Sequence, residues 1–373
     1  IIDGVVVSTG AAALAQTDAQ TTRLDLGGAV VYPGFTDSHV HLLAGSFVLD
    51  RLLLLGTSSM DRILSAVESY AASAPDEPWV VGYGWMAELV EDPSGVALDA
   101  IVSDRPVLLV DNSGHAALVN TAAMVRAGID DDTPDPDGGT IVRDQDGHAT
   151  GLLLEEALGL VSGPALADYD DATLASGLAR ALDDFSAAGI TSISEILASP
   201  GFDLTRPWIY TDMDAAGALP LRIHYFVPVF DAETGVAQAV ASRGEAESDL
   251  VRFAGAKIWV DGSMGTALAW TSEPMEGTDD HFGSHYFDAL ELTDVVEEAE
   301  EAGLALKLHV NGDAAVGAAL DAFEAVAARR GGLQQRHVLD HVVLISTADV
   351  ARMVELGLPA SIQPSHAIAS ALE

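Results

Sequence analysis

The feature that most constrains the fold of this chain is a regular alternation of short apolar runs with amphipathic stretches, clearest in its second half. Apolar runs bounded by Gly, Pro or Asp are typical of buried parallel strands. We predict such strands at 29–32, 107–110, 191–196, 221–229, 256–260, 304–310, 338–344 and 359–362. Apolar residues spaced three and four apart predict helices at 174–188, 292–302 and 314–329. Strands and helices that alternate in this way form parallel sheets with crossover helices.

A doubly wound sheet and a closed barrel both satisfy this alternation. No G-x-G-x-x-G follows an early strand and no Walker A motif is present, which disfavours the nucleotide-binding sheet. The length of 373 residues fits two average domains or one α/β barrel. The stretch at about 78–151 is rich in Gly, Pro and Asp, so we predict an insertion of turns and short strands rather than barrel units.

Charge excludes some partners. The chain carries 57 acidic and 17 basic residues, a formal net charge of −40, which argues against nucleic acid or an anionic membrane surface as a partner. The absence of cysteine excludes disulfides and thiolate ligands. Such a carboxylate-rich, lysine-poor composition resembles that of halophilic proteins, in which salt screens the self-repulsion; a merely acidic protein is the alternative. With no basic segment leading into an apolar one at its start, the chain is predicted to be cytoplasmic.

Several of the eleven histidines stand at the ends of predicted strands, and the carboxyl-terminal rim of a parallel barrel is where active sites are built. His39 and His41 are two residues apart, so in an extended strand both side chains point to the same side. Two neutral imidazoles suit a zinc ion, although such a pair also occurs as ordinary strand histidines. His309 and His341 lie in two further predicted strands.

The chain has two lysines, and both lie in apolar runs. Burial penalises an ammonium group, so Lys257 in the run 256–260 is either neutral or paired, for example with Asp261. A neutral lysine can take up carbon dioxide, and the resulting carbamate is an anionic ligand able to bridge two metal ions. Lys307, two residues before His309, is a competitor for this role.

Four segments in this order, PGFTDSHVH, AGAKIWVDGSMGTA, LKLHVNGDAAVGAALDAFE and RHVLDH, resemble the amidohydrolase superfamily. The segment VDNSGHAALVN, followed by Gly138-Gly139 and Thr150-Gly151, is similar to the YtcJ-like branch (amidohydrolase family 3), which includes N-substituted formamide deformylases. The resemblance covers nearly the whole chain. It implies a TIM-like (β/α)8 metallo-hydrolase barrel over 34–373 and, at 1–33, an N-terminal β segment that forms part of a small composite β-sandwich.

The resemblance also implies a site with two divalent metal ions. Zinc is expected, and imidazole with carboxylate would also admit Fe, Mn, Co or Ni. His39 and His41 match the ligands of the more buried metal, carboxylated Lys257 matches the bridging ligand, and His309 and His341 match the ligands of the second metal. The implied reaction is hydrolysis of a C–N bond in a small amide-type substrate by a metal-bridging hydroxide.

Other residues are given supporting roles. His115 in the insertion is a candidate substrate contact, with a loop-stabilising hydrogen bond as an equally good alternative, and His366 on the rim is a second candidate. Asp261 and Asp313 are expected to cap turns or orient the ligands. Oligomeric state is not encoded in these motifs; a homodimer is one candidate.

The chain departs from the family pattern in two places. The family's catalytic aspartate, which binds the first metal and carries the proton, should lie beyond Glu373, so no catalytic residue is assigned. We therefore expect a chain truncated at both ends, with an incomplete last barrel strand. Asp340 stands where the family usually has Glu. The alternatives to amide hydrolysis are an incomplete or degenerate homologue that binds metal without turnover, and another metal-assisted hydrolysis such as ester cleavage.

Overall fold

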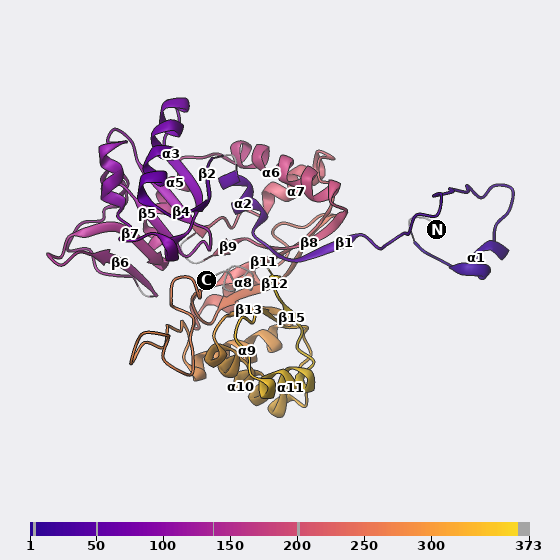
Figure 1. The fold of residues 1–373 in the computed structure, drawn as a ribbon. Helices are drawn as coiled ribbons and strands as arrows, with labels where there is room; N and C mark the ends of the chain where they lie inside the picture. The colour runs from indigo at the N-terminus through magenta and orange to yellow at the C-terminus, as the bar shows by residue number, and fades with distance from the viewer. Residues whose placement is uncertain (3–4, 50, 137, 200–201, 365–373) are drawn as a thin grey trace. The chain divides into compact units, whose positions relative to one another are not determined.

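The computed structural model describes residues 1–2, 5–49, 51–136, 138–199 and 202–364 (Figure 1). The chain divides into two compact units, Ile1–Gly34 and Phe35–Glu373. The described residues of the first unit hold one helix, α1 (Gly10–Ala15), and an isolated β-bridge between Ile2 and Val5. The predicted strand at 29–32 is wrong: Val30 and Val31 are more than 70 % exposed, at 73 % and 72 %, and have no ladder partner among the described residues. The β-sandwich assignment of residues 1–33 stays a prediction.

Seven parallel strands form the main sheet of the second unit. Their order is β1 (Phe35–Val40), β8 (Ile190–Ile196), β11 (Arg222–Val229), β12 (Val251–Trp259), β13 (Leu306–Val310), β14 (Val338–His341) and β15 (Ala360–Ser361). The hydroxyl groups of Ser38 on β1 and Ser361 on β15 lie 2.8 Å apart, so the first and last strands are neighbours and the sheet nearly closes. The prediction of an incomplete α/β barrel is confirmed.

Helices connect these strands and cover the outside of the sheet. They are α6 (Asp171–Ala187), α7 (Trp208–Ala215), α8 (Gly235–Ala241), α9 (Ala289–Ala302), α10 (Asp313–Arg330) and α11 (Thr347–Leu356). The predicted helices agree with α6, α9 and α10 to within three residues. Local signals explain the bounds of α9, which begins with a capping box at Asp288 and ends at Gly303 in the left-handed region.

The strand β13 shows how the barrel interior receives its polar side chains. Leu306, Leu308 and Val310 are fully buried in the main hydrophobic core, which also contains apolar residues of α9 and α10. Because side chains alternate along a strand, Lys307 and His309 point to the opposite face, the inside of the barrel. This alternation places chemically active groups where solvent is largely excluded.

A second sheet contains the predicted insertion. Its order is β2 (Leu52–Thr57), β3 (Val80–Trp85), β4 (Val107–Asp111), β5 (Ala116–Val119), β7 (Ala149–Glu155) and β6 (Gly139–Arg143). The β2, β3 and β4 strands are parallel and the remaining pairs antiparallel. Within the predicted insertion, Gly, Pro and Asp occupy many of the connections, and the short strands β4 and β5 are buried throughout.

The remaining helices, turns and strands complete the described chain. They are the helices α2 (Leu42–Leu49), α3 (Met60–Ser73), α4 (Thr121–Ala127) and α5 (Gly159–Ala167), the 3-10 turns η1 (Ala87–Leu89), η2 (Gly95–Ala100) and η3 (Glu156–Leu158), and the paired strands β9 (Ala198–Ser199) and β10 (Phe202–Asp203). Within the described ranges, no helix combines the length and the apolar character needed to cross a membrane.

Candidate metal centre

Four of the predicted metal ligands meet inside the barrel. His39 lies on β1 and His41 directly follows it, while His309 and His341 come from β13 and β14. The ring centroids of His39 and His41 are 5.3 Å apart, those of His39 and His341 4.7 Å, and those of His309 and His341 4.4 Å. Residues separated by up to 302 positions, from His39 to His341, therefore form one group of imidazoles.

The electrostatic environment keeps these rings neutral. Burial lowers the pKa of His39 to about 4 and holds the pKa values of His41 and His309 well below the ordinary histidine value. The Nδ1 of His41 lies 3.0 Å from the carbonyl oxygen of Ile196, so Nδ1–H donates to it and Nε2 keeps its lone pair. A carbonyl that fixes the tautomer is a typical partner of a metal-binding histidine.

The backbone at the end of β14 is unusual. His341 has a φ of +74° and Val342 a φ of +49°, a backbone region that residues other than glycine rarely occupy. The Nδ1 of His341 lies 2.6 Å from Oε1 of Gln363, which orients the ring. Such conformations cost free energy and concentrate at functional sites.

Asp340 lies at the centre of this group, a position that the sequence did not indicate. Its Oδ2 accepts a hydrogen bond from Lys257 Nζ and lies 3.0 Å from Nδ1 of His39, and its Oδ1 lies 3.4 Å from Lys307 Nζ. Burial alone would raise the pKa of Asp340, but Lys257, His39 and Lys307 together outweigh it and hold that pKa well below its usual range. The Glu-to-Asp difference from the family pattern therefore falls on a residue that touches three site side chains.

The two lysines differ in their surroundings. Burial lowers the pKa of Lys257 to about 8, against the opposing effect of Asp340, and its side chain is fully buried. Lys307 Nζ donates to the backbone carbonyl oxygen of Ser38 in addition to its contact with Asp340. Lys307 thus holds β13 to β1, whereas Lys257 forms its ion pair with Asp340.

The donor set fits divalent metal ions. Within the described residues, no group of three or more His, Asp or Glu side chains is arranged so that it could hold a metal ion as it stands. The Nδ1 of His39 and the Oδ1 of Asp340 are, however, buried atoms whose contacts described above, with Oδ2 of Asp340 at 3.0 Å and with Lys307 Nζ at 3.4 Å, lack hydrogen-bond geometry. Buried polar atoms are nearly always paired, so a cation among these neutral imidazoles would supply what they lack.

Asp261 braces the loops around the site. Its carboxylate accepts hydrogen bonds from the backbone N–H groups of Trp270 at 3.0 Å, Asn311 at 2.9 Å and Gly312 at 2.8 Å. Burial raises the pKa of Asp261 to about 7 although these amides oppose it. Asn311 in turn places Nδ2 2.8 Å from Nε2 of His309, so Asp261 orients a ligand through a neighbouring residue, as the sequence suggested. The expectation for Asp313 is met by a turn contact: its carboxylate accepts from the N–H of Ser272 at 3.0 Å.

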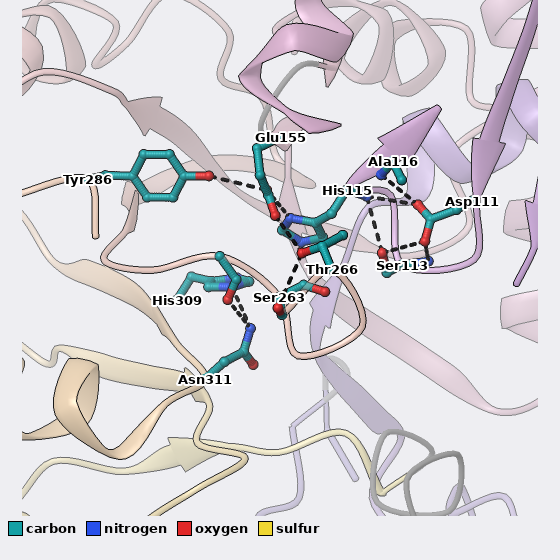
Figure 2. Close-up of polar contacts among 11 residues, drawn as sticks. Asp111, Ser113, His115, Ala116, Glu155, Ser263, Thr266, Tyr286, His309 and Asn311 are labelled. Carbon is teal, nitrogen blue, oxygen red and sulfur yellow. Dashed lines mark hydrogen bonds and ion pairs between the residues drawn. The ribbon is translucent and has the colours of Figure 1, made fainter. Parts of the chain in front are cut away.

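The second sheet brings His115 to the same place. Its ring centroid lies 5.5 Å from that of His309, and its Nδ1 lies 2.5 Å from Oε2 of Glu155 (Figure 2). Glu155 was not identified from the sequence; the only signal is an acidic residue that ends the buried strand β7. His366, the other predicted substrate contact, lies outside the described residues.

Comparison with known proteins identifies the family. The sequence pattern of the amidohydrolase family matches residues 23–372. The chain belongs to the amidohydrolase family. YtcJ of Bacillus subtilis (strain 168), an amidohydrolase by name, is 32 % identical over 384 residues, covering 99 % of this chain and 69 % of YtcJ. The N-substituted formamide deformylase of Arthrobacter pascens is 29 % identical over 386 residues, covering 97 % of this chain and 69 % of that protein. These relatives place this amidohydrolase in the YtcJ-like branch.

The chain spans 60–69 % of the length of these curated relatives. It matches 60 % of the length of LONG AFTER FAR-RED 3 of Arabidopsis thaliana, at 30 % identity over 354 residues and 93 % of its own length. The crystal structure of an uncharacterized metal-dependent hydrolase from Pyrococcus horikoshii OT3 has a TM-score of 0.67 to it at 22 % identity, covering 91 % of this chain and 64 % of that one. That likeness confirms the barrel fold.

Proposed function

We propose that this chain is the barrel part of a metal-dependent hydrolase that cleaves a C–N bond of a small amide-type molecule. The observation that carries the proposal is the convergence of three histidines beside the fully buried Lys257: the His341 ring centroid lies 4.7 Å from that of His39 and 4.4 Å from that of His309. Membership of the amidohydrolase family supports the same chemistry. The chain spans 60–69 % of the matched relatives, so the activity concerns the whole protein to which it corresponds.

Two divalent ions, preferably zinc, would be held by these side chains, with His39 and His41 on one ion and His309 and His341 on the other. When bound, the ions would polarise the substrate carbonyl and lower the pKa of a bound water molecule. Lys257 is the proposed bridging ligand in its carboxylated form. A lowered lysine pKa of about 8 supports this role, because the neutral amine is the form that combines with carbon dioxide, releasing one proton.

The residues of the chain also define the substrate side. His115 is the proposed substrate contact, since it faces His309 from the second sheet at a ring-centroid distance of 5.5 Å. His366 remains a second candidate. No catalytic proton carrier is assigned among the described residues.

Amides with a formyl or small acyl group are the first substrate class to test, because one relative is named for deformylation of N-substituted formamides. Metal binding without turnover and metal-assisted ester hydrolysis are the alternatives. Rates measured on matched amide and ester pairs with the full-length protein distinguish these three functions.

Metal analysis of the purified chain tests the site itself. We expect near-stoichiometric zinc in the wild type and its loss in His39→Ala and His309→Ala. His148→Ala is the matched control, since His148 is exposed and pairs with Asp131 at 2.7 Å far from the group of imidazoles in sequence. Zinc content that is absent in the wild type, or equal in all four proteins, contradicts the proposed centre.

Three further assignments belong to the same proposal. The net charge of −40 supports a halophilic, salt-adapted surface. A cytoplasmic location and a homodimer remain predictions from the sequence. Cell fractionation and sedimentation at several protein concentrations test these two assignments directly.

A further inference from the structure

We propose that Glu155 is a positioning residue that fixes the ring orientation and the Nδ1–H tautomer of His115, so that His115 turns Nε2 toward the amide group of the substrate. This inference rests on the proposed function. It assigns a role to a residue that the sequence motifs did not single out.

The hydrogen bond between the two side chains sets the tautomer. Nδ1 of His115 and Oε2 of Glu155 are 2.5 Å apart, and the residues are 6 % and 1 % exposed (Figure 2). Burial would raise the pKa of Glu155, but His115, Thr266 and Tyr286 together outweigh it and hold that pKa below its ordinary value. An ionised carboxylate only accepts hydrogen bonds, so Nδ1 must carry the hydrogen.

Glu155 is itself held by the long connection after β12. Thr266 Oγ1 donates to Oε1 of Glu155 at 2.8 Å, and the Tyr286 hydroxyl donates to Oε2 at 3.2 Å. The backbone N–H of Glu155 donates to the carbonyl oxygen of His115 at 2.8 Å. A carboxylate with this many partners has little freedom to rotate, so it can impose its orientation on the imidazole.

The backbone of Glu155 is strained. Its φ is +51° with ψ −128°, outside the regions that a residue with a side chain normally occupies. Glycine would adopt this conformation at lower cost. The strained position directs a carboxylate at His115, and strain of this kind is characteristic of functional constellations.

The remaining ring nitrogen of His115 is available to the substrate. The backbone N–H of His115 donates to Oδ1 of Asp111 at 3.0 Å, which fixes the residue from its other side. Among the described contacts, none gives Nε2 of His115 a hydrogen-bond partner. An amide presents both an N–H and a C=O group, so it can pair with Nε2 whether the ring is neutral or charged.

A second buried Glu–His pair provides a matched control. Nε2 of His337 lies 2.8 Å from Oε1 of Glu300, and both side chains are fully buried. Glu300 also accepts backbone hydrogen bonds from Gln334 and Gln335. The Glu300–His337 pair is thus the same type of interaction as the Glu155–His115 pair. The described partners of Glu300 and His337 include none of the proposed metal ligands.

The test compares Glu155→Gln with Glu300→Gln in the full-length, zinc-loaded protein, using an N-formyl amine as substrate. We expect Glu155→Gln to lower kcat by about 10- to 100-fold with a smaller change in KM and unchanged zinc content. We expect Glu300→Gln to lower Tm but to leave kcat per folded molecule unchanged. In ¹⁵N spectra of histidine-labelled protein, assigned with His115→Gln, the His115 signals should show the Nδ1–H form in the wild type and shift in Glu155→Gln.

Several outcomes overturn the inference: wild-type kcat in Glu155→Gln, a loss of activity that only follows lost zinc or lost fold, or unshifted His115 signals. If Glu155→Gln does not fold, Thr266→Val removes one support of the carboxylate and should lower kcat in the same direction to a smaller extent. If the wild type turns over no amide, the proposed function fails. The ¹⁵N tautomer measurement still decides whether Glu155 positions His115.

Discussion

The Nζ of Lys257 donates a hydrogen bond to Oδ2 of Asp340 in the centre of the barrel, where both side chains are fully buried. Lys307 lies 3.4 Å from the other oxygen of the same carboxylate. One buried carboxylate thus faces two amines, which favours a neutral form of one of them because an uncompensated buried charge is costly. Lys307 has the Ser38 carbonyl as a further partner, so Lys257 is the amine better placed to lose its proton.

Lys257→Ala should therefore abolish stoichiometric zinc binding, whereas Lys307→Ala should retain it. A small carboxylate such as acetate can occupy the space of a missing carbamate, so acetate should restore part of the zinc content of Lys257→Ala. Metal analysis after dialysis with and without acetate measures this. Equal zinc content in both variants would contradict the assignment of the bridging role to Lys257. So would a result in which acetate restores zinc only to Lys307→Ala.

The pH dependence of stability should carry a contribution from Glu195. Burial raises its pKa from 4.5 to about 7, although its carboxylate accepts from the N–H groups of Leu42 at 2.7 Å and Leu43 at 3.0 Å. A raised pKa means that the folded state binds the proton more tightly. The stabilisation is therefore complete below pH 4.5 and is lost as the pH rises through about 7, a change of about 3 kcal/mol.

Glu195→Gln should remove this contribution, so its free energy of unfolding should fall less than that of the wild type between these pH values. Urea unfolding at several pH values measures the difference. At Glu300 burial is outweighed by hydrogen bonds, first those from Gln335 and Gln334, which lower its pKa. The stabilisation by Glu300 is therefore lost as the pH falls, so Glu300→Gln should lose less stability than the wild type on acidification. Parallel pH profiles for wild type and Glu195→Gln would contradict the prediction.

Two glycines near the start of α10 should respond oppositely to alanine. A Cβ on Gly312 would lie 1.8 Å from the carbonyl oxygen of Trp270, so Gly312→Ala must displace backbone in the loop braced by Asp261. We expect it to lower the free energy of unfolding by about 1–3 kcal/mol. Gly317 lies inside α10 with nothing within 4 Å of the added atom, and Gly317→Ala should raise stability by about 0.5–1 kcal/mol. Thermal unfolding of both variants measures these changes. A Tm that is unchanged or raised in Gly312→Ala would contradict the prediction.

Salt should stabilise the folded chain. Its formal net charge of −40 makes self-repulsion a cost of compactness. Raising sodium chloride from about 0.1 M to about 1 M shortens the Debye length from about 10 Å to about 3 Å. We expect Tm to rise over this range, and to rise less in a variant with several exposed Asp and Glu residues changed to Asn and Gln. A Tm that is constant or falls with salt would contradict the salt-adapted surface and favour the alternative of a merely acidic protein.

Local patterns were sufficient to predict much of the barrel. Strand alternation and helical spacing depend on neighbouring residues, so β8, β11, β13, α9 and α10 were predicted close to their observed positions, whereas β12 begins five residues before its predicted run. The strand predicted at 29–32 failed because an apolar run forms a strand only where another strand pairs with it. The pairing of the second sheet has no such local signal: β4 matches the strand predicted at 107–110, but its partners β3 and β5 are decided only by the fold.

The sequence by itself determined the fold class, the family and the residue types of the candidate metal centre, because motif spacing and side-chain periodicity are properties of the chain. The tertiary structure alone decided which groups touch. Lys257 and Asp340 are 83 residues apart, and His115 and Glu155 are 40 apart, so neither pair has a local signal. The protonation of these groups follows from burial and from neighbours that only folding brings together. The proposed chemistry depends on these protonation states, so it is decided by the tertiary structure.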